Sequence, residues 1–105
     1  MTDALFDLTG KIALITGGSR GLGLEMVRAF AERGADIIIA SRKINACEKA
    51  AEEVRGMGRR ALAVSVNMSH WDQAERLVET VYGKCGSIDI LVNNAGMSPR
   101  MASHE

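Results

Sequence analysis

The strongest constraint on the fold of this chain is a regular alternation of short apolar runs with stretches of helical period. The apolar runs are residues 12–15, 37–40, 61–66 and 88–92. The first three are almost continuously hydrophobic, which is typical of strands that are covered on both faces. Strands joined by helices in this way imply right-handed crossovers and a parallel sheet. We therefore expect an α/β fold, a doubly wound half-sheet with element order βαβαβαβ and strand order 3-2-1-4.

Three stretches between the runs carry apolar residues at helical spacing. The residues expected to face the sheet are, helix by helix, Leu22, Met26, Ala29 and Phe30; Cys47, Ala50, Ala51 and Val54; and Ala74, Leu77, Val78 and Val81. Glycines predict the helix ends, at Arg33-Gly34, at Gly56 and near Gly86. Ser69 is the expected N-cap of the third helix, and Asp72 supplies an acidic first turn.

A glycine-rich turn joins the first apolar run to the first helical stretch and reads Thr16-Gly17-Gly18-Ser19-Arg20-Gly21-Leu22-Gly23. Such a turn points backbone N–H groups and the positive end of a helix at an anion, usually a phosphate. The expected roles are a tight turn for Gly17, close approach of a pyrophosphate for Gly21, and helix–strand packing for Gly23. An ordinary glycine loop is the alternative, but the position between a strand and a helix favours a dinucleotide.

Two motifs in register make the chain resemble the classical branch of the short-chain dehydrogenase/reductase family. The turn has the spacing T-G-x-x-x-G-x-G, and the fourth apolar run leads into Asn93-Asn94-Ala95-Gly96. The resemblance covers nearly the whole chain but only the first half of a usual family member. It implies a Rossmann-type NAD(P)-binding domain over residues 1–105, incomplete at its C-terminus. It also implies an oxidoreductase that transfers hydride between nicotinamide and a carbonyl or alcohol substrate, homo-oligomeric when complete.

The resemblance also implies contacts for the second motif and for the adenine. In the family, the amides after the fourth strand bridge backbone groups beside the glycine loop, while the small Ala95 and Gly96 let the cofactor lie against the chain. The aspartate that holds adenine in the family is replaced here by Asn67, which Met68 follows. A simple turn after a strand is the alternative interpretation of Asn-Asn-Ala-Gly, because Asn and Gly favour turns.

The residues after the second apolar run favour NADP(H) over NAD(H). Folds that prefer NAD place an acidic residue near the end of the second strand, where this chain has Ser41, Arg42 and Lys43. Asp36 lies five residues before Ser41, which is about 16 Å at roughly 3.3 Å per residue. Arg20 adds a second guanidinium, and two arginines suit a 2′-phosphate. Solvated charges at a helix start are the alternative, although cations are disfavoured there.

These arguments predict one cofactor site, and its candidate residues are Gly17, Ser19, Arg20, Gly21, Leu22, Gly23, Ser41, Arg42, Asn67, Met68, Asn94, Ala95 and Gly96. No catalytic residue is assigned. The family uses a Tyr with a Lys four residues later, whereas Tyr82 is the one tyrosine here and position 86 is Gly. We therefore expect this chain alone to be inactive, as a fragment or truncated product of an NADP-dependent enzyme. The alternatives are a non-catalytic NADP(H)-binding module and an interaction partner that lends its half-sheet to another chain.

The bulk composition argues against several other classes of function. Thirteen basic and thirteen acidic side chains cancel, which argues against charge-driven binding to nucleic acid or to a membrane surface. We expect neither a membrane span nor a signal peptide. Cys47 and Cys85 have no metal-ligand spacing, so no metal is expected, and both are interpreted as packing residues of a reduced, cytoplasmic protein.

Overall fold

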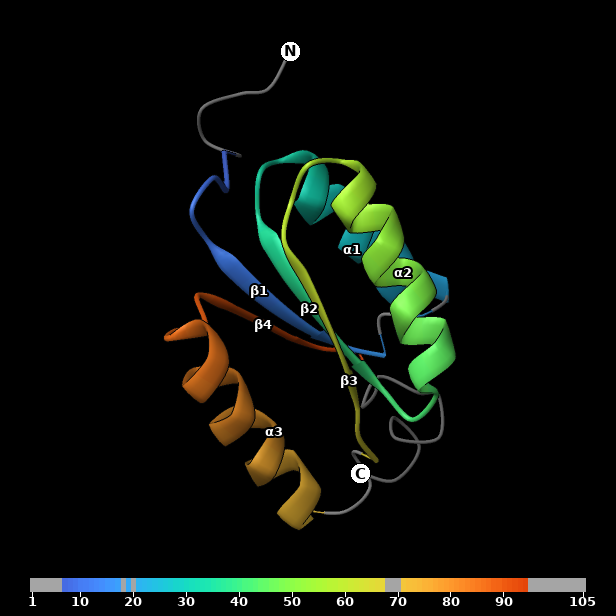
Figure 1. The fold of residues 1–105 in the computed structure, drawn as a ribbon, viewed down its shortest axis with the longest axis vertical. Helices are drawn as coiled ribbons and strands as arrows, with labels where there is room; N and C mark the ends of the chain where they lie inside the picture. Colours follow the sequence, from blue (N-terminus) through green and yellow to red (C-terminus); the bar gives the residue numbers. More distant parts are fainter. Residues whose placement is uncertain (1–6, 18, 20, 68–70, 95–105) are drawn as a thin grey trace, which may run out of the picture.

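The computed structural model describes residues 7–17, 19, 21–67 and 71–94, and these residues form the expected α/β fold. In chain order the elements are β1 (Ile12–Thr16), α1 (Gly21–Glu32), β2 (Asp36–Ser41), α2 (Ile44–Gly56), β3 (Ala61–Ser65), α3 (Trp71–Cys85) and β4 (Ile90–Asn93) (Figure 1). All neighbouring strands are parallel, and their order is β3-β2-β1-β4. The predicted element order and strand order are therefore confirmed.

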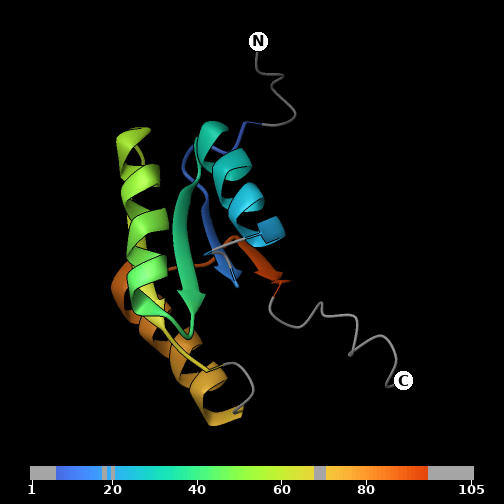
Figure 2. The ribbon, with the colours of Figure 1, turned by 90° about the vertical axis from the view of Figure 1, so that its right-hand side faces the viewer.

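The sheet lies between two helical layers, with α1 and α2 on one face and α3 on the other (Figures 1 and 2). Successive side chains of a strand point to opposite faces. Ala13 and Ile15 of β1 accordingly belong to the core under α1 and α2, while Ile12 and Leu14 belong to the core under α3. This two-sided burial explains why the central strands read as continuous apolar runs in the sequence.

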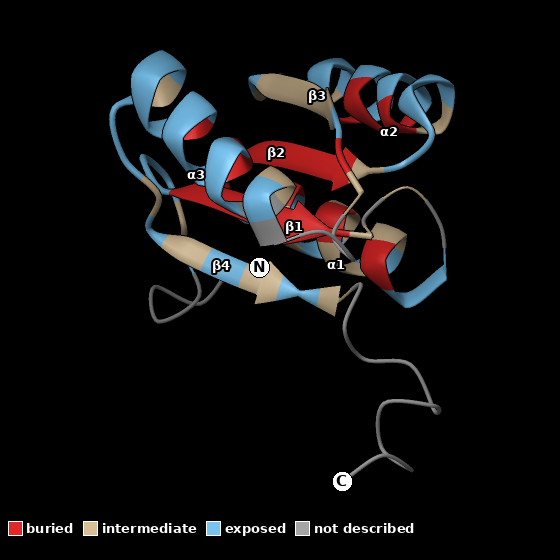
Figure 3. Ribbon diagram, turned by 90° about the horizontal axis from the view of Figure 1, so that it is seen from below, coloured by how far each residue is buried: buried red, intermediate tan, exposed pale blue. Residues whose placement is uncertain are grey.

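Burial decreases from the centre of the sheet to its edges. Every residue of β1 is buried, and the four central residues of β2 are buried as well (Figure 3). The outer strand β4 instead alternates between half-buried and exposed residues, and its Leu91 is 62% exposed. Among the described strands β4 pairs only with β1, so its other edge has no neighbour in this part of the chain.

The face that α1 turns towards the sheet differs from the predicted one. Its buried residues are Gly23, Val27 and Ala31. Leu22 is 59% exposed and Ala29 is also exposed, while Met26 and Phe30 pack only partly buried against the core. The reason is steric. Without a Cβ at Gly23 the start of α1 can press against Gly17, so the row at four-residue spacing from Gly23 faces inward.

The other two helices follow the prediction more closely. The predicted face of α2 is the buried one, namely Cys47, Ala50, Ala51 and Val54. On α3, Leu77 and Val81 are buried, but Val78 is 38% exposed because it lies one position off the inward row. Ser69, proposed as its N-cap, and the side chain of Ala74 lie outside the described residues.

Glycines lie at the helix ends much as expected. The first helix stops at Glu32, one residue before the expected end, and Gly34 follows with φ +107. The third helix stops at Cys85, and Gly86 follows with φ +84. Both conformations belong to the left-handed region that glycine adopts without steric cost.

Candidate functional site

The two sequence motifs meet at the carboxyl edge of the sheet, where β1 and β4 end side by side. Gly17 begins the turn with φ +68, and its N–H donates to the carbonyl oxygen of Ala40 over 2.7 Å. The Asn94 side-chain amide donates to the carbonyl oxygen of Gly17 over 3.3 Å. One residue earlier in each motif, Thr16 Oγ1 donates to Asn93 Oδ1 over 3.0 Å. Asn93, the last residue of β4, and Asn94, which follows it, therefore hold the first part of the glycine turn in place.

Gly21 and Gly23 have opposite surroundings, although both lie in the first turn of α1. A Cβ added at Gly23 would meet the Gly17 carbonyl oxygen at 2.1 Å and Asn94 Nδ2 at 2.7 Å. A Cβ added at Gly21, where φ is +60, would meet no atom of the described residues within 4 Å. The start of α1 is thus packed against the sheet on the Gly23 side and open on the Gly21 side. An open helix N-terminus in a parallel sheet is a suitable place for a phosphate group.

Ser41, the last residue of β2, lies beside the glycine turn. Its hydroxyl oxygen is 3.3 Å from the Ser19 hydroxyl, which donates to it, and the Lys43 N–H donates to the same oxygen over 3.3 Å. The sulfur of Cys47, in the first turns of α2, lies 3.1 Å from that oxygen. A ligand that lies along the carboxyl edge between β1 and β2 would therefore meet the side chains of both Ser19 and Ser41.

The basic residues after β2 are exposed, and the nearby acidic residue is held elsewhere. Arg42 and Lys43 are exposed, and the Arg42 carbonyl oxygen accepts from Ser65 Oγ at the end of β3 over 3.3 Å. Asp36 is the first residue of β2, as expected, and is bound there by the backbone N–H of Arg60 over 3.0 Å and by its guanidinium over 3.2 Å. No carboxylate of β2 therefore lies at the glycine turn.

The remaining candidate residues are only partly placed. Leu22 is exposed at the start of α1. Asn67 is half-buried just after β3, and its backbone N–H donates to the Gln73 side chain over 2.7 Å. The other candidates, Arg20, Met68, Ala95 and Gly96, lie outside the described residues.

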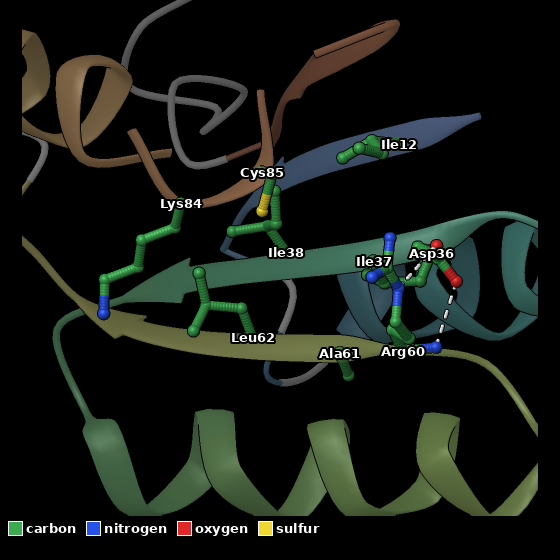
Figure 4. A pocket seen from close by; sticks show the side chains of 9 residues that line it. All are labelled: Ile12, Asp36, Ile37, Ile38, Arg60, Ala61, Leu62, Lys84 and Cys85. Atoms are coloured by element: carbon green, nitrogen blue, oxygen red, sulfur yellow. Dashed lines mark hydrogen bonds and ion pairs between the residues drawn. The ribbon is translucent and has the colours of Figure 1, made fainter. Parts of the chain in front are cut away.

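A pocket of about 250 Å³ lies at the opposite end of the sheet (Figure 4). It is bordered by the starts of β1, β2 and β3, with the Asp36–Arg60 pair on one side and Lys84 and Cys85 from the end of α3 on the other. Because the glycine turn follows the carboxyl end of β1, this pocket is separate from the candidate site.

Sequence reasoning missed two residues that shape the site. Thr16 is 1% exposed and bonds to the end of β4, and Cys47, interpreted only as a packing residue, also contacts Ser41. The T-G pair at the strand end was a usable signal for Thr16. A cysteine six positions after Ser41 carries no such signal, since its contact depends on how α2 packs against β2.

Comparison with known proteins agrees with the motifs and the fold. Residues 11–105 match the family model of the short chain dehydrogenases. The chain belongs to the short-chain dehydrogenase/reductase family. It is 44% identical over 92 residues to an uncharacterised oxidoreductase of Mycobacterium tuberculosis, covering 88% of this chain and 35% of that protein. It is also 42% identical over 97 residues to the 2-dehydro-3-deoxy-D-gluconate 5-dehydrogenase of Dickeya dadantii, covering 90% of this chain and 37% of that protein.

Solved structures of family members share the fold closely. L-sorbose reductase from Gluconobacter frateurii, in complex with NADPH and L-sorbose, matches with a TM-score of 0.82 and 38% identity, over 88% of this chain and 35% of that one. Pseudomonas aeruginosa RhlG in complex with NADP matches with a TM-score of 0.84 and 37% identity, over 93% of this chain and 39% of that one. The chain thus spans about a third of the length of these short-chain dehydrogenase/reductase relatives. Within the described residues, no helix combines the length and apolarity required of a membrane span.

Proposed function

We propose that this chain is the cofactor-binding part of an NADP(H)-dependent oxidoreductase that acts on a carbonyl or alcohol substrate. The bound nicotinamide would supply the hydride that is exchanged with the substrate. The chain's own residues would bind and orient the dinucleotide, with the pyrophosphate at the open side of Gly21 and the adenosine ribose beside Ser41 and Arg42.

The observation that carries the proposal is the meeting of the glycine turn with Asn93 and Asn94 at one edge of a parallel sheet. In open α/β sheets ligands bind outside the carboxyl ends of the strands, where the strand order reverses. Here the reversal lies between β1 and β4, which are the strands that carry the two motifs. The open space beside Gly21 leaves room for phosphate groups at the helix start.

The preference for NADP(H) is supported by the end of β2. Ser41 stands where an NAD-binding fold would have a carboxylate for the ribose hydroxyls, and Arg42 follows it with its side chain exposed. Asp36 is bound to Arg60 at the far end of the strand and has no access to this edge. A guanidinium suits the 2′-phosphate, because it offers several charged donors in one plane. The NADPH and NADP complexes of the two structural relatives are in line with this proposal.

Titration of the purified protein with NADPH and NADH, followed by cofactor fluorescence or calorimetry, tests the proposal. Arg42→Ala should weaken NADPH binding roughly tenfold or more and leave NADH binding nearly unchanged, since one charge-assisted bond is lost. Arg76→Ala, which removes an exposed arginine from α3 on the other face of the sheet, is the matched control and should change neither affinity. The double variant Ser41→Asp/Arg42→Ala should reverse the preference. Equal affinities of the wild type for both dinucleotides would contradict the cofactor assignment.

Catalysis is not expected from these 105 residues alone. Hydride transfer to a carbonyl needs a proton donor beside the developing alkoxide, a contribution of about 10²–10⁴-fold. Tyr82 is the one tyrosine of the chain, and it lies on α3, across the sheet from the start of α1. Purified residues 1–105 should therefore bind NADPH without oxidising it when offered a panel of ketones and aldehydes. Steady NADPH oxidation would contradict this part of the proposal.

A further inference from the structure

A chain of four polar contacts connects the glycine turn to the core beneath α2. The Ser41 hydroxyl lies at its centre, 3.3 Å from the Ser19 hydroxyl, 3.3 Å from the Lys43 N–H and 3.1 Å from the Cys47 sulfur. The Cys47 thiol in turn lies 3.8 Å from the carbonyl oxygen of Val64 in β3. Cys47 itself is fully buried. The innermost contacts of this chain are therefore shielded from water, while Ser19 and Ser41 are half-buried.

The direction of each bond follows from what each group can donate. A carbonyl oxygen only accepts, so the Cys47 S–H donates to Val64. Either atom of the 3.1 Å Ser41–Cys47 contact could be the donor, and we assign the proton to Ser41 because the S–H is used on Val64. Because a hydroxyl has one proton and two lone pairs, the Ser41 oxygen is left to accept from Ser19 and from the Lys43 N–H. The proton of Ser41 thus points into the core, and both lone pairs of its oxygen accept hydrogen bonds from within the protein.

We propose that Cys47 is a positioning residue that sets cofactor specificity by holding the proton of Ser41, a role that rests on the proposed function. The oxygens of a 2′-phosphate accept hydrogen bonds and need donors. With its proton held by Cys47 and both lone pairs occupied by Ser19 and the Lys43 N–H, Ser41 has no donor to offer a 2′-phosphate. Cys47 therefore restrains the preference for NADP(H) that Arg42 creates.

Removal of the thiol should make the protein more selective for NADPH. In Cys47→Ala the Ser41 proton is free to donate to the 2′-phosphate, so the ratio of NADPH to NADH affinity should rise roughly tenfold, the effect of one hydrogen bond to a charged group. Cys47→Ser keeps an acceptor for the Ser41 proton and should retain the wild-type ratio. In a Ser41→Ala background, Cys47→Ala should no longer change the ratio, because Cys47 acts through Ser41.

Val54→Ala is the control for simple loss of packing. Val54 lies in the same helix and the same core cluster as Cys47 and is also fully buried. Val54→Ala should lower the urea midpoint at least as much as Cys47→Ala does. It should leave the ratio of NADPH to NADH affinity unchanged. A ratio that moves equally in Val54→Ala and Cys47→Ala would overturn the specificity role, and so would a ratio that does not move in Cys47→Ala.

The hydrogen bond between Ser41 and Cys47 can be measured in the absence of any cofactor. The chain has two cysteines, so Cys85→Ala leaves Cys47 with the one S–H stretching band in the infrared spectrum. Ser41→Ala in that background should shift the band, because the sulfur loses its donor. An unshifted band overturns the proposed bond. A shifted band in a protein that binds neither dinucleotide overturns the proposed function and the specificity role together, while the bond stands.

Discussion

The Asn94 side chain donates a hydrogen bond over 3.3 Å to the carbonyl oxygen of Gly17, a residue 77 positions earlier in the chain. Gly23 lies against both partners, so the carbonyl, the amide and the first turn of α1 share one small space. This contact joins the two motifs of the family into a single unit. It also makes the absence of a side chain at Gly23 a requirement of packing.

Gly23→Ala should destabilise the protein. The new methyl group would approach the Gly17 oxygen to 2.1 Å and Asn94 Nδ2 to 2.7 Å, and overpacking of this kind typically costs about 1–3 kcal/mol. Gly83→Ala is the matched control, because Gly83 is helical and a Cβ there meets nothing within 4 Å. It should stabilise the protein by about 0.5–1 kcal/mol. Urea unfolding of both variants measures the two effects, and equal midpoints would contradict the packing argument.

Gly21→Ala should weaken dinucleotide binding much more than it weakens the fold. The position faces open space and has φ +60, so an alanine strains the backbone at the place proposed for the pyrophosphate. Gly58→Ala carries similar strain, with φ +85 and equally open surroundings, in the turn before β3. Both variants should lose similar stability in urea, but only Gly21→Ala should lose NADPH affinity. Unchanged NADPH binding in Gly21→Ala would mean that the turn has no role in phosphate binding.

The fold could be predicted from the sequence because its signals are local and repeat. Continuous apolar runs report burial on two faces, glycines report the helix ends, and alternation of the two elements leaves few topologies. The inward face of α1 could not be read in the same way. The hydrophobic pattern predicted that Leu22 and Ala29 face the sheet. The orientation of α1 is instead set by Gly23, which has no side chain and therefore lies directly against Gly17.

The cofactor-binding role of the candidate residues stays a prediction, and the hydrogen bonds among them could not be predicted. The glycine turn, the asparagines and the residues after β2 could be assigned from spacing and from the family resemblance. The bonds from Ser41 to Ser19 and Cys47 depend on where two helices and a strand end in space. No periodic pattern encodes such a contact. Asp36 could be placed far from the site by counting residues along β2, but its partner Arg60 could not be named.

An ion pair between the two helices of one face should make stability depend on pH. Arg28 of α1 donates to Glu53 of α2, over 3.2 Å for the Nη2–Oε1 contact. This hydrogen bond holds the pKa of Glu53 below its ordinary value of 4.5. A carboxylate whose pKa is lowered on folding stabilises the protein above its unfolded pKa, and the stabilisation is lost as the pH falls through the lowered value.

Comparison of the wild type with Glu53→Gln tests this dependence. The wild type should have the higher urea midpoint at neutral pH, and the difference should shrink as the pH falls below 4.5 and disappear below the lowered pKa of Glu53. Because the side chains of Arg28 and Glu53 are 38% and 40% exposed, the difference in midpoint should be small and should decrease with salt. Glu79→Gln, which removes an exposed carboxylate from α3, should show no such convergence. A difference in urea midpoint between wild type and Glu53→Gln that stays constant across the acid range would contradict the role of the ion pair.

Leu91→Lys should reduce self-association of the 105-residue chain. Leu91 is 62% exposed on β4, whose outer edge has no partner among the described strands, and exposed apolar edges promote strand pairing between chains. A lysine at this edge opposes such pairing by charge. Ile44→Lys, at an exposed apolar residue of α2, is the control and should not alter association. Light scattering at matched concentrations measures the size of the associated particles. Equal sizes for the wild type and Leu91→Lys would show that the β4 edge is not the contact between chains.

The central place of β1 has a consequence for the order in which the chain folds. Ala13 pairs with Ile37 of β2, 24 positions away, and with Ile90 of β4, 77 positions away. The longer loop costs about 1 kcal/mol more to close, and during synthesis β4 emerges from the ribosome after β1, β2 and β3. The three strands β1, β2 and β3 can therefore assemble while one side of β1 is still bare. Addition of β4 then brings the two family motifs together, so the candidate site forms only after β1, β2 and β3 have assembled.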